Sequence, residues 1–139
     1  MGLEERAQDR EIDGVTYRSW PLPFGIGQKA LLRTIRVLSP IMAVLTRGDQ
    51  AAVFDVLPTA LTDEDVAYFS DIFGKSSKYK DGENWVPLLT SAQELHFAGR
   101  YSAFMRWVVL NMEVNFAGFF DGKAGGMGVA DLAQMFKKS

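Results

Sequence analysis

The stretch from residue 91 to residue 120 decides the predicted fold, and it reads SAQELHFAGRYSAFMRWVVLNMEVNFAGFF. Ser91 stands three residues before Glu94, which is the spacing of a capping box at the first turn of a helix. Apolar residues then recur every three or four positions along two adjoining lines. The first line is Leu95, Ala98, Tyr101, Met105, Val108, Met112 and Phe116, and the second is Phe97, Phe104, Trp107, Leu110, Val114 and Phe120. These lines predict one long helix that is apolar around most of its circumference, so the rest of the chain or a partner must cover it.

This long helix is not predicted to cross a membrane. Polar and charged residues interrupt every window of about 18 residues, the length that a spanning helix needs. These residues are Arg100, Arg106, Asn111, Glu113 and Asn115. A central core helix is therefore the favoured interpretation, and a surface for an oligomer or a partner is the alternative.

Composition and charge exclude several classes of protein. The chain has 139 residues, enough for one domain with a buried core, and 47% of them are apolar. The net charge of −2 gives no general electrostatic attraction to nucleic acid or to an anionic membrane. There is no cysteine, which excludes disulfide scaffolds, thiol nucleophiles and thiolate metal sites. The charged residues 1–6 contain no apolar segment of a secretory signal.

Two turn signals predict the β-structure. Asp13-Gly14 and Asp81-Gly82 each lie between residues that favour strands. We therefore expect short β-strands or hairpins near residues 12–20 and 78–87, preceded by a polar N-terminal arm at residues 1–11.

Most of the remaining chain is predicted to be helical. A helix begins near Gln28, after a turn at residues 25–27, and Pro40 kinks or restarts it. Its apolar face carries Leu31, Leu32, Ile35 and Leu38, with Arg33 and Arg36 outside that face. Further helices are expected at residues 50–57 and over 62–74, where Thr62 and three acids start the helix and Gly74 follows its end.

The predicted fold class is therefore mainly α. A small helical domain covers residues 12–120, with the long helix at its centre. Residues 121–128 are a glycine-rich tether, and residues 129–139 form a short amphipathic helix. This tail is expected to dock on the domain or to bind something else.

The residues that carry chemistry form no known catalytic or metal-binding motif. His96 is the only histidine, and Glu94, two residues away, lies on a different face of the helix. The acids at residues 63–65 point in different directions and are interpreted as helix-capping groups. Phosphate-loop, dinucleotide, zinc and hydrolase motifs are all missing. We therefore predict that the protein is not an enzyme and that it holds no cofactor or metal.

The order of several short motifs gives a further indication of function. In chain order they are Gly14-Val15-Thr16-Tyr17, Pro21-Leu22-Pro23, Leu61-Thr62-Asp63-Glu64-Asp65, Phe73-Gly74-Lys75, His96-Phe97-Ala98-Gly99-Arg100-Tyr101 and Asn115-Phe116-Ala117-Gly118-Phe119-Phe120. Over residues 12–120 this layout resembles the tail assembly chaperones of long-tailed bacteriophages, which are small and mostly helical proteins.

The resemblance implies an accessory role in virion assembly, in the cytoplasm of the host cell. Members of this family bind the tape measure protein, keep that long apolar helical chain soluble and help to recruit subunits of the major tail tube protein around it. They commonly form homo-oligomers and are usually absent from the finished particle. The competing interpretation is a structural virion component, such as a tail completion or baseplate protein.

Aromatic and aliphatic side chains on the long helix and on the tail are the candidate protein-interaction residues. Aromatic residues supply a large share of the binding energy at protein interfaces. Phe119 and Phe120 lie where the helix meets the glycine-rich tether, so the domain is least able to enclose them. The complete set of candidates is Trp107, Phe116, Phe119, Phe120, Leu132 and Phe136.

Overall fold

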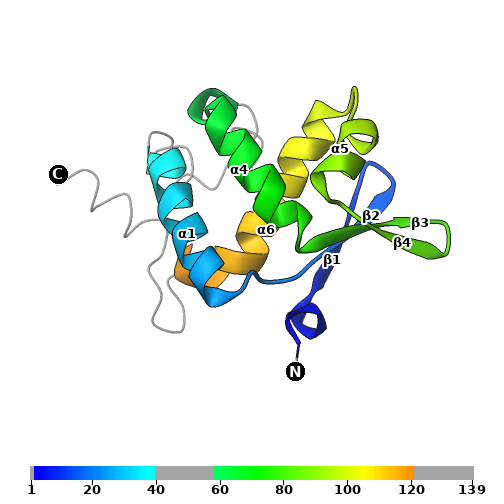
Figure 1. Ribbon diagram of the computed structural model, residues 1–139, viewed down its shortest axis with the longest axis horizontal. Coiled ribbons are helices and arrows are strands. Elements are labelled where there is room, and N and C mark those ends of the chain that lie inside the picture. Colours follow the sequence, from blue (N-terminus) through cyan, green and yellow to red (C-terminus); the bar gives the residue numbers. More distant parts are fainter. Residues whose placement is uncertain (1, 40–57, 121–139) are drawn as a thin grey trace.

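The computed structural model describes residues 2–39 and 58–120, whose arrangement is shown in Figure 1. The labels of the helices and strands follow that figure. In chain order the elements are the 3-10 helix η1 (Leu3–Arg6), the strands β1 (Gln8–Ile12) and β2 (Val15–Ser19), the helices α1 (Phe24–Leu38) and α4 (Asp63–Gly74), the strands β3 (Ser77–Asp81) and β4 (Asn84–Pro87), and the helices α5 (Thr90–His96) and α6 (Tyr101–Phe120).

Two hairpins join into one antiparallel sheet with the strand order β1-β2-β3-β4. In the first hairpin Asp13 and Gly14 have positive φ angles of 51° and 83°, as a two-residue turn of type I′ requires. Strand β2 then pairs with β3, and Ser19 lies opposite Ser77. The turn residues therefore predicted the positions of both hairpins correctly. The predicted polar arm, however, contributes residues 8–11 to strand β1.

The prediction of a mainly α fold is wrong, because the four-stranded sheet makes the domain a mixed α/β structure. Figure 1 shows the sheet at the lower right of the view and helix α1 at the left. The pairing of β2 with β3 joins residues that are 58 positions apart in the chain. Local periodicity identifies single strands and carries no information about such a distant pairing.

The predicted long helix is two helices. Helix α5 ends at His96 and α6 begins at Tyr101. Gly99, between them, has a φ of 71°, a left-handed conformation that ends a helix and that glycine adopts without a steric penalty. Ser91 is not the predicted cap, because it lies inside α5, whose N-cap is Leu89 without a side-chain hydrogen bond.

The ends of the other helices correct two expectations and confirm one. Helix α1 starts directly after Pro23, so the glycines at residues 25 and 27 lie within the helix and not in a turn. At the start of α4 the Thr62 hydroxyl accepts from the Asp65 N–H, and the Asp65 carboxylate accepts from the Thr62 N–H. This complete capping box confirms the predicted start. Gly74 is the last residue of α4, not the residue after it. The predicted kink at Pro40 and helix at residues 50–57 lie outside the described residues.

Helix α6 lies at the centre of the domain and packs on the inner face of the sheet. Arg10 of β1 forms an ion pair with Glu113 of α6, with 2.6 Å between nitrogen and oxygen. Deeper in the core the hydroxyls of Ser19 and Ser77 are 2.9 Å apart, and the Ser77 hydroxyl donates to the side-chain oxygen of Asn111. These polar contacts lie within a core of apolar side chains. Most of the apolar surface of α6 is therefore buried inside its own domain.

Candidate protein-interaction surfaces

The described candidates on α6 are not exposed. Trp107 is completely buried, and only 5% of the Phe116 surface is exposed, so neither is an anchor for a partner. Phe119 and Phe120 form the end of α6, but their side chains are not described. Leu132 and Phe136 lie outside the described residues. The reason for the correction is that strands β1 and β2 and helices α1 and α4 pack against α6, so α6 is the core of the domain.

An exposed apolar row lies instead on helix α1. Phe24 is 82% exposed and Leu32 is 63% exposed. With Gln28 between them they are spaced four residues apart, and residues at this spacing are neighbours on a helix surface. Leu31 and Ile35 are half-buried, and the same spacing places them between this row and the core. We call Phe24, Gln28 and Leu32 the α1 row.

The sequence contained a signal for the α1 row, and two wrong assumptions hid it. The helix was predicted to begin near Gln28, which left Phe24 outside it. The pattern also placed Leu31, Leu32, Ile35 and Leu38 on a single apolar face. A start at Pro23, a residue type that is tolerated in the first turn of a helix, would have shown Phe24 and Leu32 on one side.

The neighbouring side of α1 is basic. The helix contains Lys29, Arg33 and Arg36 and has no acidic residue. Arg33 and Arg36 both donate to one oxygen of Asp65 on α4, at 3.1 and 3.0 Å. Lys29 is exposed, and no ion pair to it is found among the described residues. Among the described residues one carboxylate therefore pairs with two of the three cations of α1, which leaves this side of the helix with a net positive charge.

Asp65 is held in its ionised form at the base of this surface. Its side chain is only 4% exposed. Burial alone would raise the pKa of Asp65, but the hydrogen bonds from Thr62 and the charges of Arg36 and Arg33 hold it below its ordinary value. The carboxylate thus fixes the two arginines against α4 while the α1 row stays uncovered.

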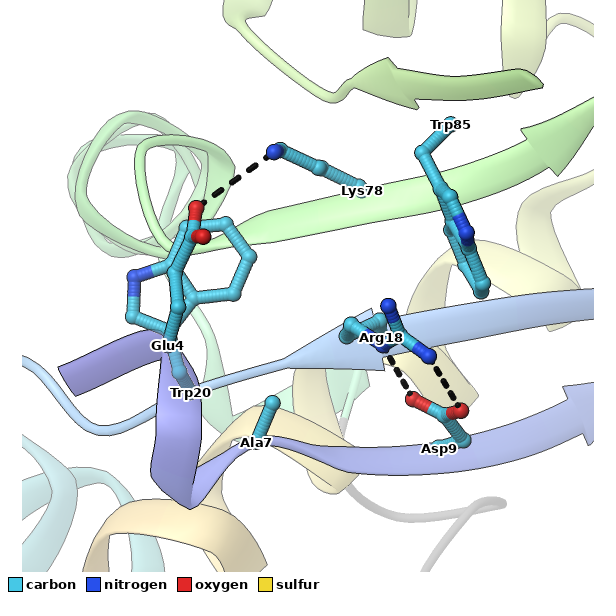
Figure 2. A pocket seen from close by; sticks show the side chains of 7 residues that line it. All are labelled: Glu4, Ala7, Asp9, Arg18, Trp20, Lys78 and Trp85. Carbon is cyan, nitrogen blue, oxygen red and sulfur yellow. Dashed lines mark hydrogen bonds and ion pairs between the residues drawn. The ribbon is translucent and has the colours of Figure 1, made fainter. Parts of the chain in front are cut away.

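The outer face of the sheet carries a different, polar surface (Figure 2). A hollow of about 430 Å³ is lined by Glu4, Ala7, Asp9, Arg18, Trp20, Lys78 and Trp85. Arg18 donates to both oxygens of Asp9, at 2.8 and 3.0 Å, and its guanidinium lies 4.1 Å from the centre of the Trp85 ring. Lys78 pairs with Glu4 at 3.4 Å. Both of these cations already have an acidic partner, so this hollow offers less unbalanced charge than α1 does.

His96, the last residue of α5, is half-buried against the sheet. Its ring stacks on Tyr79, with 4.0 Å between ring centres, and its Nε2 is 2.7 Å from the Tyr17 hydroxyl. Burial lowers the pKa of His96 from its ordinary value, and the positive charge of Arg100 lowers it further. Among the described residues its ring contacts are with Tyr17, Tyr79 and Phe97 and not with an acid that would support a catalytic base, and they are those of a structural residue.

The lowered pKa of His96 predicts a loss of stability in mild acid. The unfolded chain binds a proton at a higher pH than the folded chain, so the free energy of unfolding should fall as the pH drops below about 6.5. Denaturant midpoints measured at pH 7.5 and 5.5 should show this decrease. In His96→Gln the difference between the two midpoints should shrink, because the chain has no other histidine. An equal difference in both proteins would contradict the assignment.

Residues 2–39 and 58–120 contain no group of three or more acidic or histidine side chains placed to hold a metal ion. Within the same ranges, no helix has the length and the apolar character needed to cross a membrane.

Comparison with known proteins gives one family. The family model described as "Phage tail assembly chaperone protein, TAC" matches residues 13–128, which is most of the chain. No curated protein and no solved structure gives a significant match. The matched region begins at the turn between β1 and β2 and includes α1, the rest of the sheet and α6.

Proposed function

The chain belongs to the phage tail assembly chaperone family, and from this membership we propose that it binds the tape measure protein and assists assembly of the tail tube around it. It acts in the host cytoplasm, as a homo-oligomer, and leaves before the particle is complete. Its role is binding and not catalysis. The family match carries this proposal, and the exposed α1 row is the surface that we assign to the client.

The α1 row suits an apolar client. Phe24 and Leu32 are two of the exposed large apolar side chains of the described residues, while Ala30 and Val37 of the same helix are buried in the core. Burying such a side chain contributes about 1.5–3 kcal/mol relative to leaving it in water. Two of them supply a large part of a micromolar affinity, before the costs of association are subtracted. A client that covers this row would have its own apolar surface removed from water, which is how a chaperone keeps it soluble.

Co-expression with the tape measure protein of the same phage tests the proposal. We expect the soluble fraction of the tape measure protein to rise when the chain is present and the two proteins to purify together. Equal solubility with and without the chain would overturn the proposal.

Mass spectrometry of purified virions separates this function from its alternative. A chaperone should be missing from the finished particle. A stoichiometric amount of the chain in virions would instead identify a structural component, such as a tail completion or baseplate protein.

A further inference from the structure

Helix α1 presents an apolar row and a basic row side by side. Phe24 and Leu32 mark the first, and Lys29 and Arg36, seven residues apart and both exposed, mark the second. The helix spans 15 residues, or about four turns, so both rows run along most of its length. Two parallel rows of this kind match the surface of another amphipathic helix better than they match an extended peptide.

From these rows we infer that α1 binds one amphipathic helix whose apolar stripe is bordered by acidic residues. The inference rests on the proposed function, in which this helix is a segment of the tape measure protein. The apolar stripe covers Phe24 and Leu32, and the acidic border lies against Lys29 and Arg36. Charge complementarity decides the sign of the border, because α1 has three cations and no acid, and Asp65 is the carboxylate that pairs with two of them among the described residues.

A second copy of this chain is a poorer occupant for the same surface. Two α1 helices packed antiparallel about a two-fold axis would have their basic rows on the same side of the contact, since an isologous interface uses the same patch twice. The carboxylate of Asp65 pairs with Arg33 and Arg36 and forms no ion pair with Lys29. A homo-oligomer should therefore use another face.

Two designed peptides test this inference on the full chain. Both have about three heptads with leucine at positions a and d, and they carry either glutamate or lysine at the flanking positions e and g. Like charges along each peptide oppose its self-association, so both remain available to bind. By fluorescence anisotropy, the glutamate peptide should bind about tenfold more tightly than the lysine peptide, and Lys29→Glu should reduce this preference.

A matched pair of variants locates the site. Phe24→Ser with Leu32→Ser should abolish binding of the glutamate peptide, whereas Leu95→Ser with Tyr101→Ser should not change it. Leu95 and Tyr101 are 88% and 77% exposed, so the control removes as much exposed apolar surface from another place. All four side chains are exposed, and thermal melting should show both double variants folded.

The results separate the inference from the proposed function. Equal binding of the two peptides, or an equal loss in the Leu95 and Tyr101 variant, would overturn the inference. The inference would also be overturned if the variant with serine at positions 24 and 32 kept the tape measure protein as soluble as the wild type does. The proposed function would stand in that case. A wild type that does not solubilise the tape measure protein would overturn the proposed function itself.

Discussion

Replacing Trp107 with alanine should lower the free energy of unfolding by about 3–5 kcal/mol. The side chain is completely buried, and its ring centre lies 5.4 Å from that of Phe97, 5.8 Å from that of Phe104 and 6.5 Å from that of Phe73. Removing it leaves a cavity where the rings of α4, α6 and the α5–α6 connection meet. Small domains are stable by about 5–15 kcal/mol, so urea unfolding should show a large shift of the midpoint.

Trp107→Phe is the matched control for the alanine variant. It keeps an aromatic ring in the core and removes the indole nitrogen, which is buried and has no hydrogen-bond partner among the described residues. Because an unpaired buried donor itself costs about 1–3 kcal/mol, the loss in Trp107→Phe should be much smaller. If both variants lost the same stability, the packing of the aromatic ring would not be the main contribution of Trp107 to the free energy of unfolding. A Trp107→Ala protein that kept its stability and lost only client binding would restore Trp107 as an interaction residue.

Replacing Gly74 with alanine should also destabilise the domain, by roughly 1–3 kcal/mol through overpacking. An added Cβ would meet the carbonyl oxygen of Leu88 and would lie 2.6 Å from Nε2 of Gln93. That nitrogen donates to the carbonyl oxygens of Leu88 and Ser70, at 2.7 and 2.9 Å, and so links α5 to α4. The methyl group therefore displaces both a backbone segment and a buried hydrogen-bonded side chain.

Gly25→Ala provides the control for the glycine substitution. Gly25 lies in helix α1, and an added Cβ there meets no atom within 4 Å. Alanine favours the helix over glycine by about 0.5–1 kcal/mol, so this variant should be as stable as the wild type or more stable. Thermal melting of the two variants compares the effects directly. Equal melting temperatures for Gly74→Ala and the wild type would show that α5 can shift to make room for the methyl group without a loss of stability.

Local signals were sufficient for several elements of this protein. Asp13-Gly14 located the first hairpin, and Thr62 with Asp65 located the start of α4. In each case the residues that carry the signal also make the contacts, within a few positions of one another. The resemblance to tail assembly chaperones is likewise confirmed by the family match, since it depended on the order of short motifs along the chain.

The interaction surface was harder to predict from the same information. Trp107 and Leu32 are both apolar residues in helices, and periodicity assigned each of them to an apolar face. The structure buries Trp107 completely and leaves 63% of Leu32 exposed. Exposure depends on which other elements pack against a helix, and periodicity gives only the direction in which a side chain points.

The sequence by itself determined the turns, the cap of α4, the family and the apolar character of the segment that became α6. The tertiary structure decided that two hairpins form one sheet, that the helix is interrupted at Gly99 between α5 and α6, and that α6 is the core while one side of α1 stays exposed. The physical reason is the range of the interactions. Hydrogen bonds of turns and caps close within a few residues, whereas the pairing of β2 with β3 and the burial of α6 depend on contacts between residues that are tens of positions apart.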